Sequence, residues 1–199
     1  MGKIYKSIVN HLPETASGVF VEIGSERGEG STIAMSSWAH NFDTKLITVD
    51  IAPDAKNNLE GKIPNTEFVI SSGSAWAKEV GNTNLRISVL YLDNFDYIWD
   101  INDVSAAIRQ QIHQYAGQGI VMSNQNCQKE HMSQIMALYP LLTPDAVVAF
   151  DDTYCLNDCW VGKCGPVVVY LQTQGFSIVR YEDKTFEVIL KREKSNVHL

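Results

Sequence analysis

Short apolar runs rich in β-branched residues recur along this chain, and most of them stop at a glycine or an aspartate. Five such runs cover residues 19–23, 46–50, 67–71, 87–93 and 146–150. They are too short to be buried helices, so they predict strands that are buried on both faces of a parallel sheet. The sheet then requires the segments between the runs to return the chain as helices.

The segments between the runs contain good helix formers or begin at residues suited to a helix start, such as Pro53 and Ser74. The predicted helices cover residues 31–40, 53–59, 74–80, 104–115, 129–142 and 167–173. The runs 176–181 and 186–190 are separated by four polar residues, which predicts a β-hairpin. We therefore predict an α/β fold in a single domain of residues 1–199: a doubly wound, mostly parallel seven-stranded sheet with a C-terminal antiparallel hairpin.

Charge and hydropathy argue against several classes of function. The 199 residues carry a net charge of -7 with scattered basic residues, which disfavours a sequence-independent grip on nucleic acid. No apolar run approaches the ~18 residues of a membrane span, and the N-terminus lacks the apolar core of a secretory signal. We expect a cytoplasmic protein with a small-molecule substrate and neither a nucleic acid nor a membrane as partner. A homo-oligomer is compatible with the sequence.

Three of the four cysteines, Cys155, Cys159 and Cys164, lie within ten residues in the spacing C-x3-C-x4-C. Such a cluster suggests a zinc or iron–sulfur site, but it contains no C-x2-C pair and lacks an evident fourth ligand. The pattern favours reduced thiols that bind nothing, with metal and disulfide roles as the alternatives.

A glycine-rich turn follows the first strand, with Gly24, Gly28 and Gly30 as its glycines. Glycines permit positive φ angles and a close approach of backbone to ligand. Asp50 ends the second strand twenty residues beyond Gly30, the distance at which a carboxylate holds ribose hydroxyls. Since ligands of open parallel sheets bind beyond the carboxyl ends of the strands, these groups and Asp93 are expected to converge on one crevice.

The turn alone does not identify its ligand, because dinucleotide-binding proteins share a glycine turn followed by an acid. Here the spacing is E-x-G-x-x-x-G-x-G rather than G-x-G-x-x-G. The carboxylates of Glu22 and Glu29 suit a cationic amino acid better than a pyrophosphate. A terminal antiparallel hairpin is also unexpected in a dinucleotide-binding sheet. A tight loop without a ligand is the remaining alternative.

Five segments together resemble the class I S-adenosylmethionine-dependent methyltransferases. Residues 21–32 resemble the first motif of that family, 47–50 the second, and 72–74 the turn after the third strand. Residues 89–93 and 142–152 resemble the ends of the fourth and fifth strands. The order and spacing of five motifs over nearly the whole chain are more specific than any one of them.

The resemblance implies a role for each matching position. Glu22 and the turn backbone would hold the methionine part of the cofactor, Asp50 its ribose, and Asp93 would lie beside them. Trp76 could stack on the adenine or pack in the core. The implied cofactor-binding residues are Glu22, Gly24, Ser25, Gly28, Gly30, Asp50, Ser72, Gly73, Ser74 and Asp93.

Asp93, Asp151 and Asp152 form a second group, similar to small-molecule O-methyltransferases of the catechol and macrolide-sugar types. In those enzymes the matching acids bind a divalent cation, so the resemblance implies a cation such as Mg²⁺ on these three aspartates. A cation held by carboxylates lowers the pKa of a substrate hydroxyl and fixes it near the methyl group. Helix or turn capping and direct substrate binding are the alternatives for these aspartates.

The chain departs from that pattern beyond Asp93. Asp96 occupies the position of a lysine in catechol-type enzymes, and it is a candidate general base although the spacing is D-x-x-D. His113 and His131 could act as bases or merely pack. Lys163, flanked by glycines, could form a loop for a substrate anion or start the next helix.

The sequence thus predicts an S-adenosylmethionine-dependent methyltransferase acting on a small molecule, with Mg²⁺-assisted O-methylation and Asp93 and Asp96 as catalytic residues. One alternative is an NAD(P)-dependent oxidoreductase, which the glycine spacing and the lack of a Tyr-x3-Lys pair oppose. The other is a non-catalytic methyltransferase-like binding domain, in which the aspartates are ordinary caps.

Overall fold

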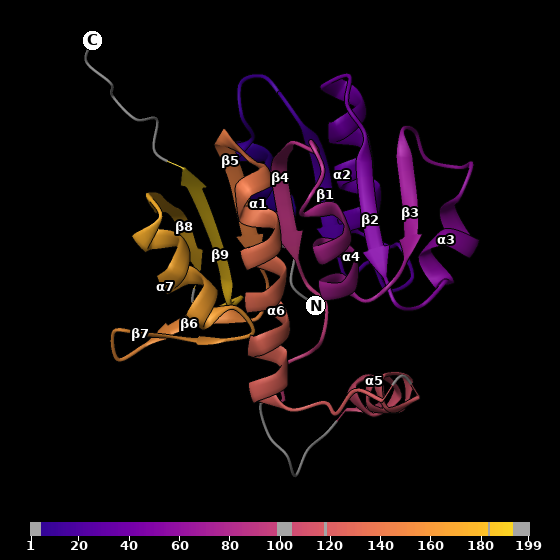
Figure 1. Ribbon diagram of the computed structural model, residues 1–199, viewed down its shortest axis with the longest axis vertical. Coiled ribbons are helices and arrows are strands. Elements are labelled where there is room, and N and C mark those ends of the chain that lie inside the picture. Colours follow the sequence, from indigo (N-terminus) through magenta and orange to yellow (C-terminus); the bar gives the residue numbers. More distant parts are fainter. Residues whose placement is uncertain (1–4, 99–104, 118, 183, 193–199) are drawn as a thin grey trace.

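The computed structural model describes residues 5–98, 105–117, 119–182 and 184–192. Its main feature is a seven-stranded sheet in the order β3-β2-β1-β4-β5-β9-β8 (Figure 1). Strands β1 to β5 are mutually parallel where they pair, and β9 runs antiparallel to both β5 and β8. The strands are β1 Val19–Ile23, β2 Leu46–Asp50, β3 Thr66–Ile70, β4 Ile87–Leu92, β5 Leu142–Phe150, β8 Phe176–Glu182 and β9 Glu187–Arg192. The predicted mostly parallel sheet with its C-terminal antiparallel hairpin is therefore confirmed.

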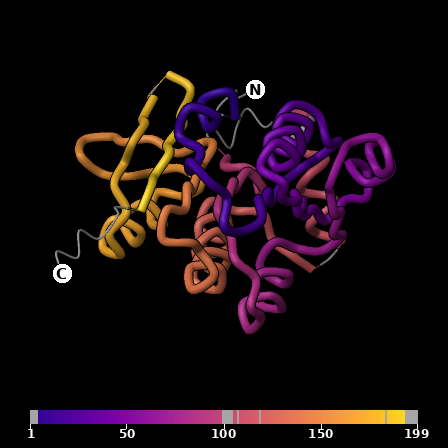
Figure 2. The backbone as a smooth tube through the Cα atoms, turned by 90° about the horizontal axis from the view of Figure 1, so that it is seen from above, coloured from indigo at the N-terminus to yellow at the C-terminus, as the bar shows by residue number. Residues whose placement is uncertain are grey.

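Helices cover both faces of the sheet. On one face α4, α6 and α7 pack against β-strand side chains through residues such as Trp76, Ile135 and Val168. On the other face α1 and α2 contribute Ile8 and Met35. Figure 2 shows the N-terminal helices (indigo to purple) and α6 (orange) on opposite sides of the sheet. The helices are α1 Tyr5–Ile8, α2 Ser31–Asn41, α3 Asp54–Leu59, α4 Gly73–Val80, α5 Ala106–Ala116, α6 Asn124–Leu138 and α7 Gly165–Thr173, with 3-10 turns η1 Val9–His11 and η2 Tyr139–Leu141.

The two cores explain why the strands read as continuous apolar runs. Alternate residues of β1, such as Val21 and Ile23, join the core under α4, α6 and α7. Phe20, which precedes Val21, joins the core under α1 and α2 on the opposite face. All six residues of β4 are buried in the same way. Burial on both faces removes the polar alternation of a half-exposed strand.

Several elements differ from the sequence-based prediction: α6 ends at Leu138 rather than at 142, and β5 begins at Leu142 rather than at 146. Helix α6 begins at Asn124 rather than at 129, because the Ser123 hydroxyl accepts the N–H of Asn126 and caps the helix start. A separate antiparallel hairpin, β6 Thr153–Leu156 and β7 Cys159–Gly162, was not predicted. The predicted helix over 104–115 corresponds to α5, and residue 104 lies outside the described residues. Within the described ranges, no helix combines the length and apolar character of a membrane span.

The parallel strands bring the candidate residues to one edge. Strands β1 to β5 all end at this carboxyl edge, which faces downward in Figure 1 toward α5 and the β6–β7 hairpin. The connections leaving this edge contain the glycine turn, Asp50, Ser72, Asp93 and Asp151. The fold thus gathers the sequence-predicted residues from five separate stretches of chain.

Candidate active site

The glycine turn begins at Gly24, where the end of β1 passes close to the chain leaving β4. Gly24 has a φ of 102°, and a Cβ there would come within 2.5 Å of the backbone nitrogen of Asn94. Gly28 has a φ of 82°, and its missing side chain leaves room for Leu59. Both positions demand glycine for conformation and for space, so the spacing read from the sequence has a steric basis.

Asp50 holds this turn in place. Its Oδ2 accepts the N–H groups of Ser25, at 2.9 Å, and of Glu26, at 2.8 Å. Its Oδ1 accepts the N–H of Ala52 at 2.9 Å. The backbone of Ile51 also hydrogen-bonds to this carboxylate, so Asp50 is anchored to both the glycine turn and the chain that follows β2. The sequence assigned Asp50 to ribose alone, and the clamping of the turn is an additional role.

Glu22 is a fully buried carboxyl group behind the turn. Its Oε2 accepts the hydroxyls of Thr32, at 2.7 Å, and of Thr48, at 2.9 Å. Its Oε1 is buried and has no hydrogen-bond partner among the described residues. Burial raises the pKa of Glu22 to about 7, against the hydrogen bonds of Ser31, Thr32 and Thr48. A buried acceptor left open in this way suits a ligand that brings a positive charge or a donor.

The turn after β3 is packed beneath α6. The N–H of Ser74 donates to Oε1 of Glu130 at 2.8 Å, and Gln134 donates to the same oxygen at 3.1 Å. A Cβ on Gly73 would overlap the Gln134 amide and the Ile23 side chain, so a larger residue here would require these side chains to move. Trp76 is 4% exposed and belongs to the core, which supports packing rather than stacking on a ligand.

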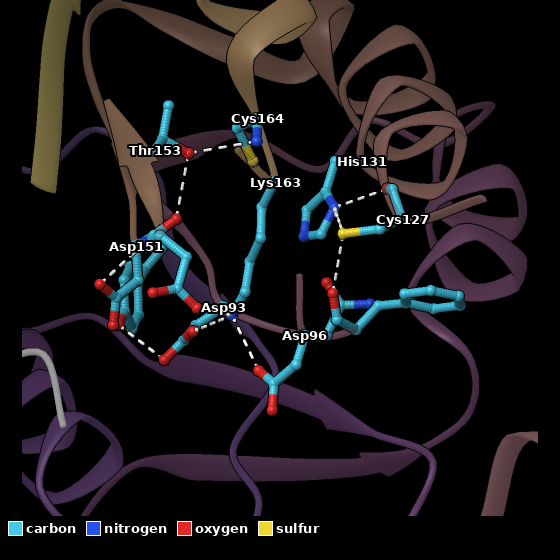
Figure 3. A network of polar contacts seen from close by, with 12 residues as sticks. Asp93, Asp96, Cys127, His131, Asp151, Thr153, Lys163 and Cys164 are labelled. Atoms are coloured by element: carbon cyan, nitrogen blue, oxygen red, sulfur yellow. Dashed lines mark hydrogen bonds and ion pairs between the residues drawn. The ribbon is translucent and has the colours of Figure 1, made fainter. Parts of the chain in front are cut away.

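Beyond β4 and β5, carboxylates converge on the ammonium group of Lys163. Nζ lies 2.8 Å from Oδ1 of Asp93, 3.1 Å from Oδ1 of Asp96 and 3.1 Å from Oδ2 of Asp152. Figure 3 shows the lysine side chain extending toward Asp93 and Asp96. The Lys163 side chain is 1% exposed, whereas those of the three aspartates are 28%, 28% and 31% exposed. The aspartates thus face the surface with the lysine beneath them.

The remaining oxygens of the three aspartates differ in their partners. Oδ2 of Asp93 accepts the Tyr91 hydroxyl at 2.9 Å, and Oδ2 of Asp96 accepts the Gln111 amide at 2.7 Å. Oδ1 of Asp152 has no hydrogen-bond partner within the described part of the chain. Asp152 is therefore the member of the cluster with an oxygen left for a bound molecule.

Asp151 is turned away from the lysine. Its Oδ1 accepts the N–H of Asp152 at 2.9 Å, so it stabilises the turn that follows β5. Burial and the charge of Asp93 raise the pKa of Asp151 to about 7, against the attraction of Lys163. Of the three predicted metal ligands, Asp93 and Asp152 come together, and Asp96 takes the place expected for Asp151.

The opposite charges of Lys163 and the aspartates stabilise each other's charged forms. Burial alone lowers the pKa of Lys163, but the surrounding aspartates outweigh it and raise that pKa well above the ordinary value. Burial raises the pKa of Asp93, and Lys163 opposes that rise. Lys163 is therefore an ammonium ion throughout the physiological range, held by a charge-assisted hydrogen bond to Asp93 and by ion pairs with Asp96 and Asp152.

The histidines and cysteines lie apart from this cluster. His131 is fully buried, and its Nδ1 donates to the carbonyl of Cys127 at 2.8 Å (Figure 3). Burial lowers its pKa to about 4, so it is neutral near pH 7, while His113 is exposed on α5. The hairpin pairs Cys155 with Trp160, and Leu156 with Cys159, so the two cysteines face opposite sides of the ribbon.

All four thiols are free, and Cys127 and Cys164 are buried. The described residues contain no group of three or more histidines, cysteines or acids arranged to hold a metal ion.

Comparison with known proteins rests on structure. No protein-family model matches the chain, and a search of curated proteins finds no match. A TDP-rhamnose 3'-O-methyltransferase of calicheamicin biosynthesis matches with a TM-score of 0.60 at 13% identity, covering 94% of this chain and 76% of its own. A methyltransferase-type protein of Streptococcus mutans, solved with S-adenosylhomocysteine, gives 0.55 at 13% identity, covering 94% and 97%. A Plasmodium falciparum protein assigned as a ribosomal RNA methyltransferase gives 0.53 at 15% identity, covering 96% and 95%.

The chain has the class I methyltransferase fold. The resemblance of the five motifs is confirmed at the level of fold, and the strand order with an antiparallel β9 agrees with it. Within this methyltransferase fold, the residues fit S-adenosylmethionine. The open Oε1 of Glu22 is a buried acceptor beside a turn of positive-φ glycines, which suits a cationic amino acid.

The residues do not fit Mg²⁺ in the same way. The ion would need the oxygens of Asp93 and Asp152, and the ammonium of Lys163 already lies 2.8 and 3.1 Å from them. Asp151, the third predicted ligand, directs an oxygen to the backbone of its own turn. The arrangement therefore does not support the predicted Mg²⁺ site, and Lys163 is the residue whose role the sequence did not reveal.

Proposed function

We propose that the chain is an S-adenosylmethionine-dependent methyltransferase that acts on a hydroxyl group of a small molecule. The observation that carries the cofactor assignment is the buried, unpartnered Oε1 of Glu22 beside the glycine turn of a methyltransferase fold. The structural neighbour solved with S-adenosylhomocysteine supports the same cofactor.

Each part of the proposed cofactor site has a distinct task. Glu22 and the turn from Gly24 through Ser25 and Gly28 to Gly30 hold the methionine part. Asp50 keeps the turn in place and lies beside the proposed ribose position. The adenine lies against the turn after β3, formed by Ser72, Gly73 and Ser74. When bound, S-adenosylmethionine supplies a methyl group on a cationic sulfur.

The acceptor site in this proposal is the carboxylate cluster. Asp93 and Asp96 have both oxygens engaged, so Oδ1 of Asp152 is the atom that can take a proton from an acceptor hydroxyl. The hydroxyl oxygen gains its bond to the methyl carbon as its proton passes to the carboxylate, and the carbon–sulfur bond breaks. Asp152 thus replaces Asp96 as the proposed general base, while Asp93 and Asp96 position it through Lys163.

A small-molecule acceptor is favoured over RNA. One structural neighbour is a TDP-rhamnose methyltransferase and another is assigned to ribosomal RNA, so the fold alone leaves both open. The net charge of -7 disfavours the binding of RNA, which is a polyanion, because RNA binding depends on clustered lysines and arginines. Three partly exposed carboxylates at the acceptor site would also repel a phosphate backbone.

Titration calorimetry with S-adenosylhomocysteine tests the cofactor assignment. We expect one binding site per chain, and Asp50→Ala should weaken the affinity at least tenfold because two backbone donors of the glycine turn, and that of Ala52, lose their acceptor. Asp54→Ala, at an exposed position four residues further on, is the matched control and should bind like the wild type. Absence of binding to the folded wild-type chain would refute the proposal.

A further inference from the structure

Lys163 reaches the cluster because of the hairpin that precedes it. The N–H of Lys163 donates to the carbonyl of Asp152 at 2.9 Å, and Gly162, with a φ of 91°, makes the close approach possible. The two residues are therefore tied through their backbones at the open end of β6–β7. This tie aims the lysine side chain back beneath the carboxylates.

The charge of the ammonium group is surrounded by carboxylates where it lies. Nζ donates a hydrogen bond to Oδ1 of Asp93 and forms ion pairs with Asp96 and Asp152. Its side chain is 1% exposed, so it has no alternative position in water without moving the chain around it. Displacing it would leave a buried charge without partners, which is strongly unfavourable.

A divalent ion would need the same space. Metal–oxygen distances for Mg²⁺ are about 2.1 Å, so an ion bound by Oδ1 of Asp93 and Oδ2 of Asp152 would overlap the position of Nζ, which lies 2.8 and 3.1 Å from these two oxygens. The two cations would also repel each other at that separation. One positive charge can therefore occupy the centre of the cluster, and the chain provides its own.

We propose that Lys163 is the resident cation of this site and that it replaces a divalent metal, so that the chain binds its acceptor without metal. Lys163 is a positioning residue: it holds Asp93, Asp96 and Asp152 together and leaves Oδ1 of Asp152 for a hydrogen-bond donor on the acceptor. The acceptor role rests on the proposed function. Metal binding is measured without cofactor or acceptor. A failure of the lysine-for-metal proposal can therefore be distinguished from a failure of the proposed methyltransferase function.

Mn²⁺ titration, followed by electron paramagnetic resonance, tests the replacement directly. The wild-type chain should show no stoichiometric Mn²⁺ site up to millimolar concentration. Lys163→Ala removes the ammonium from three partly exposed carboxylates, and we expect it to bind one Mn²⁺ at least tenfold more tightly than the wild type. Mn²⁺ should also raise its thermal midpoint, because a bound ligand stabilises the folded state. Lys78→Ala, at an exposed position on α4, should remain without response.

Two further measurements keep the test decisive. Lys163→Arg retains the charge and should bind no more Mn²⁺ than the wild type, so it serves if the alanine variant does not fold. One Mn²⁺ per wild-type chain, lost in Asp152→Asn, would overturn the proposal because the metal would then coexist with the lysine. A folded Lys163→Ala that gains no Mn²⁺ affinity would overturn it equally, since the lysine would not be standing in for a cation.

Discussion

At Glu22, a single carboxyl group couples the stability of the fold to pH. Burial raises its pKa from 4.5 to about 7 in the folded chain. Because the folded pKa lies above the unfolded one, the stabilising contribution is complete below pH 4.5 and is lost as pH rises through 7. The wild type should lose on the order of 2 kcal/mol from this group between pH 5 and pH 8.

Glu22→Gln should remove that loss, because the side chain no longer ionises. Urea unfolding at pH 5 and pH 8 measures the effect as the difference between variant and wild type at each pH. The variant should gain relative to the wild type at pH 8. Glu79→Gln, at an exposed position on α4, is the control and should parallel the wild type. Equal pH dependence in wild type and Glu22→Gln would contradict the prediction.

Asp152 is the second residue whose role is testable by itself. With its Oδ1 open, it is placed to act as the general base, and general bases contribute about 10²- to 10⁴-fold to rates. Asp152→Asn should lower kcat by about 100-fold or more on an acceptor that the wild type methylates within a panel of hydroxylated small molecules. Calorimetry should find its S-adenosylhomocysteine affinity unchanged.

Asp158→Asn is a matched control at the tip of the hairpin, where a φ of 61° is tolerated by asparagine. It should keep the wild-type kcat. A full kcat in Asp152→Asn would show that the proton leaves by another route, with Asp96 as the next candidate because it faces the same lysine.

Among the elements, the β6–β7 hairpin controls the cluster. A Cβ at Gly162 would overlap the carbonyl oxygen of Asp152, and the φ of 91° is unfavourable for any other residue. Gly162→Ala should therefore destabilise the chain by about 2 kcal/mol or more, and it should displace Lys163 as well. Chemical denaturation measures the loss of stability.

Gly61→Ala separates the two causes. Gly61 also has a positive φ, of 75°, but nothing lies within 4 Å of the position of its Cβ. The Gly61→Ala variant should lose only the free energy due to the unfavourable backbone conformation, about 1 kcal/mol of stability. If both variants lose the same amount, the overlap with Asp152 is relieved by small movements and the hairpin is less rigid than its geometry indicates.

The elements also show what the sequence could reveal. The five parallel strands were predictable because burial on both faces makes them continuous apolar runs, as in β4. The hairpin was not, because Thr153–Leu156 and Cys159–Gly162 have four residues each and lack a glycine in the turn between them. The turn instead uses Asn157 and Asp158 at positive φ.

Lys163 illustrates the same limit at the site. The aspartates could be predicted from their positions after strands, since parallel strands end at a common edge. The lysine lies 70 residues beyond Asp93, and its direction depends on a hairpin that has no clear sequence pattern. A cluster of acids without its buried cation looks like a metal site, which is why the sequence predicted Mg²⁺.

For the whole molecule, the net charge distinguishes the two kinds of substrate that proteins of this fold methylate. A chain of net charge -7 whose proposed acceptor site is lined by carboxylates releases few counterions from a nucleic acid. We expect a fluorescently labelled single-stranded RNA to show no anisotropy change with roughly 10 µM protein, even at low salt, where electrostatic binding is strongest. A known RNA-binding protein under the same conditions is the positive control. RNA binding that weakens steeply with added salt would reveal a basic surface strong enough to overcome the net charge, and would make RNA the acceptor to test in place of hydroxylated small molecules.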